Sequence, residues 1–132
     1  MAATEHMERQ IAPTVLVIDD EDYVADMLAS ALEIEGYTVH LAYNGRDGLA
    51  LAQTLRVDLV IIDIMMPYMN GIALVQELRH LDHTLHVPII LISAGARPRQ
   101  QMPGVRFLPK PFDLNIMLDL IGTALESPGV NE

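Results

Sequence analysis

The chain has 132 residues and a formal net charge of −10, with 51% apolar and 20% charged residues. This balance is typical of one globular domain, and the acidic excess predicts repulsion from nucleic acid and from anionic membranes, so neither is expected as a partner. The chain has no cysteine, which excludes disulfides and thiol chemistry.

The folded domain is expected to span residues 13–126. Residues 1–12 lack the apolar region of a signal peptide and are expected to form a disordered lead. Residues 127–132 are expected to form a short tail. No apolar run reaches the roughly 18 residues that a membrane helix needs.

The first half of the chain alternates between strand-like and helix-like patterns. The patterns predict a strand over 15–18, a helix over 21–35, a strand over 38–42, a helix over 45–55 and a strand over 59–62. The strands at 15–18 and 59–62 are continuous apolar runs, which is typical of strands buried on both faces. Gly36 is a suitable stop for the first helix, and Asn44 a suitable cap for the second, whose inner face would carry Leu49 and Ala50.

The second half continues the alternation with one gap. It predicts a helix over 72–81, a strand over 89–92, a strand over 105–108 and a helix from Asp113 to about residue 125. Between the last two strands, Pro98 and Pro103 would each disfavour a helix by about 3 kcal/mol. The connections are otherwise short, so the chain predicts an α/β fold in which helices cover both faces of a parallel sheet.

Polar side chains follow four of the five predicted strands, at the edge where ligands of parallel sheets bind: Asp19 and Asp20, then Asp63, Ser93 and Lys110. Three carboxylates held together would repel one another, so a positive group must offset them. Lys110 is one candidate and Mg²⁺ (or Mn²⁺) another, because Mg²⁺ binds carboxylates and shares its shell with phosphate oxygens. A carboxylate between such cations is a competent phosphoryl acceptor, with Ser93 as a donor to a phosphoryl oxygen.

Four motifs appear in order: VLVIDDE at 15–21, DLVIIDIMMP at 58–67 with MNG at 69–71, PIILISA at 88–94 and FLPKPF at 107–112. With them the sequence resembles the receiver (CheY-like) domain of two-component response regulators over nearly all of residues 13–126. The resemblance implies a doubly wound, flavodoxin-like sheet of five strands in the order 2-1-3-4-5. It also implies a fourth helix, which the prolines and a shorter segment between Ser93 and Lys110 predict to be shortened or absent.

The resemblance implies a role for each matching residue. Asp63 would be the phosphoacceptor and would bind Mg²⁺ together with Asp20 and the backbone carbonyl of Met65, while Asp19 would act mainly through a metal-bound water. Lys110 would pair with Asp63 and then with the phosphoryl group.

Other roles implied by the resemblance concern the response to phosphorylation. Ser93 would move toward the phosphoryl group, and Phe107 would turn inward as the output face rearranges. The Lys110–Pro111 bond would be cis. In the family, the fourth helix belongs to the face commonly used for output and dimerisation. A shortened fourth-helix region is therefore expected to change how phosphorylation is read out at that face.

The implied partners are a histidine kinase or histidine phosphotransfer protein and an unknown downstream protein. The resemblance implies a cytoplasmic monomer or weak homodimer. It implies no enzymatic activity apart from the protein's own phosphorylation and autodephosphorylation. The alternative is a receiver-like interaction module that needs no phosphate. A Mg²⁺-dependent phosphohydrolase would want a second carboxylate two residues after Asp63, where Met65 stands instead. A flavin phosphate would be repelled by the acidic loops.

Three further features have two interpretations each. The side chain of Met65 either screens an acyl phosphate from water or is simply an exposed loop residue. The arginines at 97, 99 and 106 form a solvated basic stretch, or contact an acidic partner. The histidines at 80, 83 and 86 are interpreted as a solvated helix end in preference to a metal site.

Overall fold

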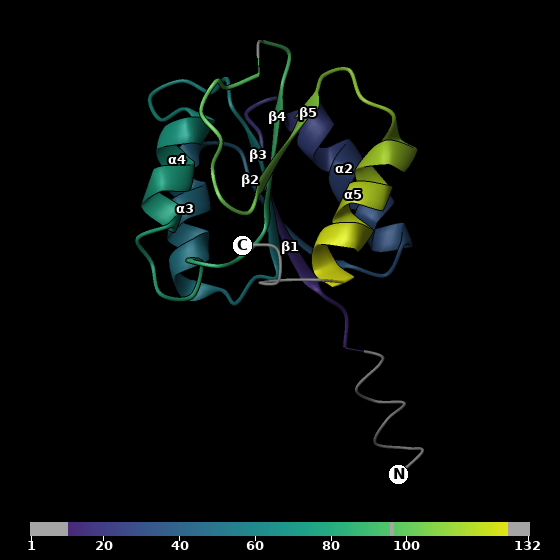
Figure 1. Cartoon of the computed structure of the whole chain (residues 1–132). Helices are drawn as coiled ribbons and strands as arrows, with labels where there is room; N and C mark the ends of the chain where they lie inside the picture. The colour runs from purple at the N-terminus through teal and green to yellow at the C-terminus, as the bar shows by residue number, and fades with distance from the viewer. Residues whose placement is uncertain (1–10, 96, 127–132) are drawn as a thin grey trace.

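The computed structural model describes residues 11–95 and 97–126, which form a parallel sheet covered by helices (Figure 1). The strands are β1 (Thr14–Ile18), β2 (Thr38–Ala42), β3 (Leu59–Asp63), β4 (Ile89–Ser93) and β5 (Val105–Pro109). The helices are α2 (Asp22–Ile34), α3 (Gly45–Thr54), α4 (Gly71–Leu78) and α5 (Leu114–Glu126). The strand order is β2-β1-β3-β4-β5, and every pairing is parallel, which confirms the predicted fold.

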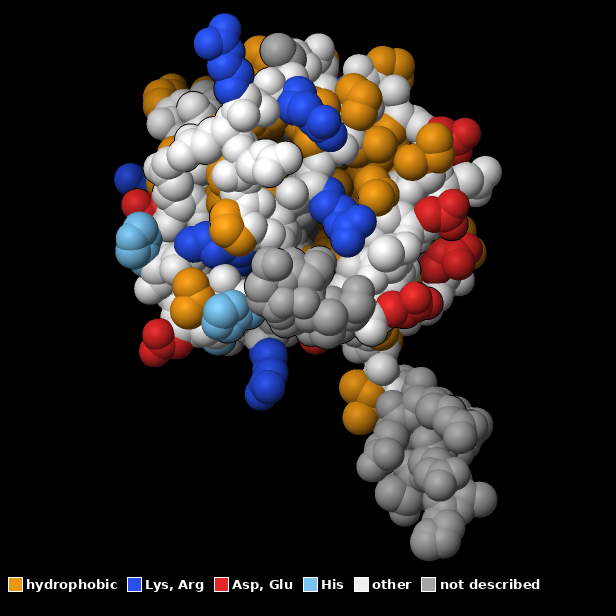
Figure 2. All heavy atoms as spheres, in the orientation of Figure 1, with side chains coloured by type: hydrophobic (Ala, Val, Ile, Leu, Met, Phe, Trp, Pro, Cys, Tyr) orange, Lys and Arg blue, Asp and Glu red, His pale blue; other side chains and the backbone are white. Residues whose placement is uncertain are grey.

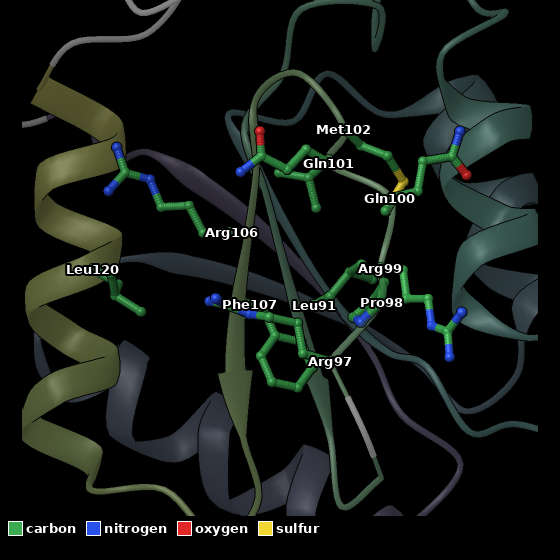
Figure 3. A pocket seen from close by; sticks show the side chains of 11 residues that line it. Leu91, Arg97, Pro98, Arg99, Gln100, Gln101, Met102, Arg106, Phe107 and Leu120 are labelled. Carbon is green, nitrogen blue, oxygen red and sulfur yellow. The ribbon is translucent and has the colours of Figure 1, made fainter.

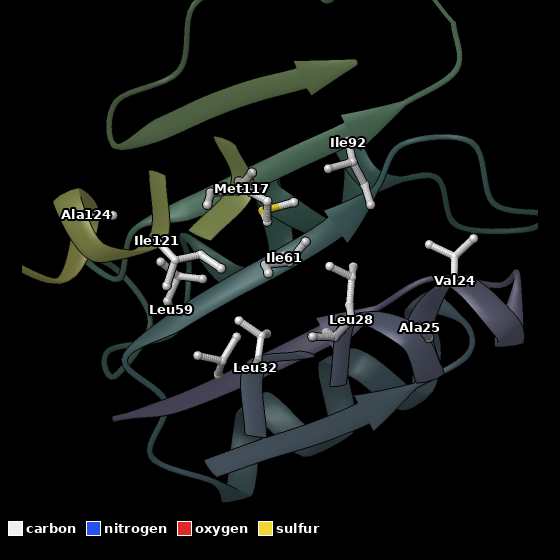
Figure 4. Packing of buried hydrophobic residues seen from close by; sticks show 13 residues of the cluster. Val24, Ala25, Leu28, Leu32, Leu59, Ile61, Ile92, Met117, Ile121 and Ala124 are labelled. Atoms are coloured by element: carbon white, nitrogen blue, oxygen red, sulfur yellow. The ribbon is translucent and has the colours of Figure 1, made fainter. Parts of the chain in front are cut away.

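The sheet separates two apolar cores. In Figure 1, α3 and α4 lie on one face of the sheet, and α2 and α5 lie on the other. Figure 4 shows the second core, where Leu28 and Leu32 of α2 and Met117 and Ile121 of α5 pack against Ile61. All the residues of β3 and β4 are buried, because helices cover both of their faces.

The helix ends follow local signals. Gly36 has φ of +99°, a conformation that glycine adopts without strain, and it ends α2 as predicted. The Asn44 side chain accepts a hydrogen bond from the Asp47 amide at the start of α3. Ala50 is exposed, contrary to the prediction, because Gly48 and Ala52 take the buried positions of that helix.

The helix α4 ends at Leu78, three residues before the predicted 81. The amides of His80 and Leu81 bond to carbonyls three residues earlier, in the tighter pattern that commonly ends a helix. The Arg79 guanidinium then donates hydrogen bonds to carbonyls of two following loops. Its Nη1 donates to the carbonyls of Thr84 and Val87, both at 2.8 Å, and its Nη2 donates to Pro103 at 3.2 Å.

The segment between β4 and β5 contains no helix in its described residues, 94–95 and 97–104, which confirms the predicted loss. In Figure 1 it runs along the face of the sheet that carries α3 and α4. Met102 from this segment packs against that core, as do Val105 and Phe107 of β5. The segment leaves β5 only half-buried. No helix among the described residues is long and apolar enough to cross a membrane.

Candidate functional site

The register of the sheet brings the predicted polar residues to one edge. Asp19 directly follows β1, and the last pair between β1 and β3 joins Ile18 to Ile62, so Asp19 and Asp63 leave neighbouring strands at the same level. One carboxylate oxygen each from Asp19, Asp20 and Asp63 lie within 4.8 Å of one another. Asp19 and Asp63 are buried, and Asp20 is exposed.

Backbone amides orient the two buried carboxylates. Asp19 Oδ1 accepts the amide of Glu21 at 2.9 Å, and Asp63 Oδ1 accepts the amide of Met65 at 3.2 Å. Gly71 closes the loop after Asp63 by donating its amide to the carbonyl of Ile64. A Cβ at Gly71 would lie 2.7 Å from Ile64 Cα and 2.8 Å from the carbonyl oxygen of Asp63, so the loop needs glycine there.

Lys110 supplies the positive charge at this edge. Its Nζ lies 3.1 Å from Asp19 Oδ2, 3.4 Å from Asp63 Oδ2 and 2.8 Å from Glu21 Oε1. Its backbone amide donates to the carbonyl of Ser93, which anchors the lysine beside β4. The Lys110–Pro111 bond is cis, as predicted. Sequence reasoning did not single out Glu21 as a member of the site, although it directly follows the acidic pair.

Burial and charge shift the acidities at the site. Burial and, after it, the charge of Asp19 raise the pKa of Asp63, Lys110 and the Met65 amide act against the rise, and the net effect is a pKa raised from 3.8 to about 6. Burial lowers the pKa of Lys110, but its contacts with Glu21, Asp19 and Asp63 outweigh burial and leave that pKa above its ordinary value. Lys110 is therefore fully charged at neutral pH.

The acidic cluster fits a divalent cation. Among the described residues, Asp19 Oδ2 is a buried oxygen that accepts no hydrogen bond, and its contact at 3.1 Å is the ion pair with Lys110. One ammonium shared by Asp19, Glu21 and Asp63 offsets only part of their charge, so the cluster can accommodate a further cation. Oxygen ligands from two or three carboxylates are the donors that Mg²⁺ prefers.

The remaining predicted site residues lie around this cluster. Ser93 is buried at the end of β4, and its Oγ accepts the amide of Gly95 at 2.9 Å. The Met65 side chain is 61% exposed, and its sulfur would lie 3.0 Å from a Cβ at Gly95, so it reaches across the mouth of the site. Phe107 lies on β5, half-buried, with the Arg97 guanidinium 5.4 Å from its ring centroid.

The histidines do not converge on one another. His80 Nδ1 contacts the carbonyl of Gln76, His83 Nε2 contacts the carbonyl of Ala52, and His86 is exposed. Within the described part of the chain, the group that fits a metal is the aspartate cluster alone. Arg79 was missed by sequence reasoning because its partners are backbone carbonyls, which leave no signal in side-chain patterns.

A family model described as the response regulator receiver domain matches residues 15–122. The chain belongs to the response regulator receiver family. The transcriptional regulator RpaA of Synechocystis is 34% identical over 111 residues, covering 80% of this chain and 46% of RpaA. The regulatory protein AtoC of Escherichia coli is 36% identical over 117 residues, covering 85% of this chain and 25% of AtoC.

Comparison with solved structures agrees with this family assignment. The chemotaxis protein CheY4 of Vibrio cholerae has a TM-score of 0.80 and 29% identity, and the match covers 85% of this chain and 98% of CheY4. The chain thus spans less than half the length of RpaA and AtoC but nearly all of CheY4. As a receiver domain of response regulators, it serves in phosphorylation-dependent signalling.

Proposed function

We propose that Asp63 of this receiver domain accepts a phosphoryl group from a phosphohistidine on a histidine kinase or phosphotransfer protein. The P–N bond of the donor breaks as a P–O bond to an Asp63 carboxylate oxygen forms, which leaves an acyl phosphate. The convergence of Asp63 with Asp19, Asp20 and Lys110 is the observation that carries the proposal. An acceptor needs its carboxylate ionised and the incoming charge neutralised; Lys110 favours both, and a cation held by the carboxylates would add to its effect.

We propose that Asp19, Asp20, Asp63 and the backbone carbonyl of Met65 hold Mg²⁺ (or Mn²⁺), with Asp19 acting mainly through a metal-bound water. When bound, the ion neutralises charge that develops on the phosphoryl oxygens. Ionisation of Asp63 is then favoured too, because a nearby cation counteracts the burial and the Asp19 charge that raise its pKa.

Lys110 and Ser93 would complete the contacts to the phosphoryl group. The Lys110 ammonium already lies 3.4 Å from Asp63 Oδ2, so a short side-chain movement would bring it to a phosphoryl oxygen. The Ser93 hydroxyl accepts a hydrogen bond from Gly95, which leaves its own proton to donate. Movement of Ser93 toward the phosphoryl group would transmit the change to Phe107 on the neighbouring strand.

The surface around the site suits a protein donor. Tyr23 and Met27 of α2 and Met65 and Tyr68 of the loop after β3 are exposed apolar residues near the strand ends. Exposed apolar side chains of this kind are available for contact with a protein partner. We propose that the histidine-bearing partner docks there, and that an unknown downstream protein reads the phosphorylated form.

The remaining assignments are part of the same proposal. Residues 13–126 form the receiver domain, supported by the family match over residues 15–122. The expected lead at 1–12 and tail at 127–132 fall almost wholly outside the described residues. We propose a cytoplasmic monomer or weak homodimer whose chemistry is limited to its own phosphorylation and autodephosphorylation.

Labelling with acetyl phosphate tests the central step. With Mg²⁺, intact-protein mass spectrometry is expected to show a gain of one phosphoryl group, and EDTA is expected to abolish it. Asp63→Asn should remove the gain, while Asp58→Asn, which lies just before the first residue of β3, should keep it. An unchanged mass for the parent protein, with no response to beryllofluoride, would instead favour the phosphorylation-independent interaction module.

A second experiment addresses the role of Met65. If its side chain screens the acyl phosphate, Met65→Asn should shorten the lifetime of phosphorylated Asp63, because a polar side chain admits and orients water at the mouth of the site. The lifetime is measured by mass spectrometry after removal of acetyl phosphate. Equal lifetimes would leave Met65 as an exposed loop residue only.

A further inference from the structure

A hollow lies beside β5, where the described residues of the connecting segment, 94–95 and 97–104, form no helix. Its volume is about 600 Å³, within the range of pockets that bind small organic molecules. Figure 3 shows the residues that line it, which come from β4, from the segment after β4, from β5 and from α5. Leu91, Met102, Val105, Phe107 and Leu120 supply its apolar lining. The missing helix therefore leaves a partly apolar surface open beside the edge strand of the sheet.

The same hollow is lined by three arginines, Arg97, Arg99 and Arg106. The chain carries eight lysines and arginines against eighteen acidic residues, so this cluster is a local reversal of the overall charge. In Figure 2, Lys and Arg side chains stand around the middle of this face, while acidic side chains gather on the side of α2 and α5. An anion approaching this face would meet a local positive field.

These three guanidiniums carry no carboxylate partner among the described residues, in contrast to Lys110, which contacts three carboxylates. Arg97 lies over the Phe107 ring, 5.4 Å from its centroid. In Figure 3, Arg106 reaches toward α5 and Arg99 toward α4, so the charges flank the hollow on both sides. Gln100 and Gln101 add amide donors and acceptors to its rim.

We propose that this hollow binds a nucleotide-sized organic anion, one with a flat ring and phosphate groups. The ring would stack on the platform of Phe107 and Arg97, because aromatic and guanidinium faces both stack on heterocyclic rings. The phosphate oxygens would be held by Arg97 and Arg106, with Arg99 on the opposite wall, since a guanidinium binds phosphate through paired hydrogen bonds. A nucleic acid strand is disfavoured, because a long polyanion would also meet the acidic surface around the hollow.

Titration of the full chain with AMP, ATP and GTP in EDTA tests the proposal without involving the aspartate cluster. Isothermal titration calorimetry and backbone NMR shifts are expected to show saturable one-site binding of at least one nucleotide, with a Kd below about 1 mM. Shifts should centre on β5 and on residues 97–102. The double variant Arg97→Gln/Arg106→Gln should weaken binding at least about tenfold, the loss expected when a charge-assisted hydrogen bond is removed.

Three controls separate the proposal from its alternatives. Arg46→Gln, an exposed arginine on α3, should bind as the parent does, and the double variant should still label Asp63 from acetyl phosphate, which verifies its fold. Tripolyphosphate, which has no ring, should bind more weakly than ATP. The proposal is overturned if no nucleotide binds, if the double variant binds equally well, or if tripolyphosphate matches ATP. Binding of a Glu-rich amphipathic peptide without any nucleotide binding would overturn it in favour of a protein-docking surface.

Discussion

Lys110 Nζ lies 2.8 Å from Glu21 Oε1 and 3.4 Å from Asp63 Oδ2, so the ammonium is closer to an exposed carboxylate than to the proposed phosphoacceptor. Glu21 is half-exposed, whereas Asp63 is buried. To contact a phosphoryl group on Asp63, Lys110 would have to leave or stretch its contact with Glu21. Glu21 is therefore positioned to restrain the lysine before phosphorylation.

Glu21→Gln is expected to speed the labelling of Asp63 by acetyl phosphate at saturating Mg²⁺. An exposed ion pair contributes about 0.2–1 kcal/mol, so the gain should be at most roughly fivefold. The matched control is Asp22→Asn, which removes a neighbouring exposed charge. An equal effect from both variants would show that bulk charge is responsible and that the contact with Lys110 is not.

Asp63→Asn is expected to stabilise the metal-free protein at pH 7. Because the folded-state pKa of Asp63 is raised from 3.8 to about 6, the folded protein binds this proton more tightly than the unfolded chain does. The free energy of unfolding therefore falls as pH rises from about 4 to about 6, and the deficit persists above that range. The free energy of unfolding of the variant should exceed that of the parent by up to about 3 kcal/mol at pH 7 and by nothing below pH 3.8, measured by urea unfolding in EDTA. A difference independent of pH would contradict this origin.

Mg²⁺ is expected to raise the melting temperature, because it would bind the folded acidic cluster and stabilise it by about 2.7 kcal/mol at a hundredfold excess over its Kd. Asp20→Asn removes one of the three clustered carboxylates and should abolish most of the increase. Asp20 is exposed, so the metal-free variant should keep its stability within about 0.5 kcal/mol. Asp22→Asn, with its charge outside the cluster, should respond to Mg²⁺ as the parent does.

Gly71→Ala is expected to lower the free energy of unfolding by roughly 1–3 kcal/mol, because the added methyl would collide with backbone atoms of Asp63 and Ile64. It should also slow the labelling of Asp63, since the collision lies in the loop that orients it. Gly122→Ala is the control. Nothing lies within 4 Å of its Cβ, so on α5 it should stabilise by about 0.5–1 kcal/mol. Urea unfolding measures both, and a loss of stability in both would refute the steric argument.

Tyr68→Gly is expected to stabilise the fold by about 1 kcal/mol. Tyr68 has φ of +69°, a left-handed conformation that costs a non-glycine residue roughly 1–2 kcal/mol. Its side chain is fully exposed, so no packing is lost on removal. Tyr68→Val should have the opposite effect, because β-branched residues tolerate this conformation poorly. If the glycine variant unfolds at the same urea concentration as the parent, the strain is absent.

Much of this protein follows from its sequence. Continuous apolar runs predicted the central strands, and Asn44 and Gly36 marked helix ends, because strand burial and capping depend on neighbouring residues. The prolines predicted the loss of the helix between β4 and β5. Asp19, Asp63, Ser93 and Lys110 were placed together because parallel strands deliver their carboxyl ends to one edge.

Only the tertiary structure decided the contacts between distant side chains. Glu21 and Lys110 are 89 residues apart, and the backbone carbonyls that bind Arg79 leave no trace in the residue pattern. The exposure of Ala50 depended on which side of α3 faces the sheet. The hollow beside β5 depended on the path of the segment that precedes this strand. Local patterns determine which elements form and where they end, whereas the shape of the surface between elements arises from packing that brings remote side chains within a few ångströms.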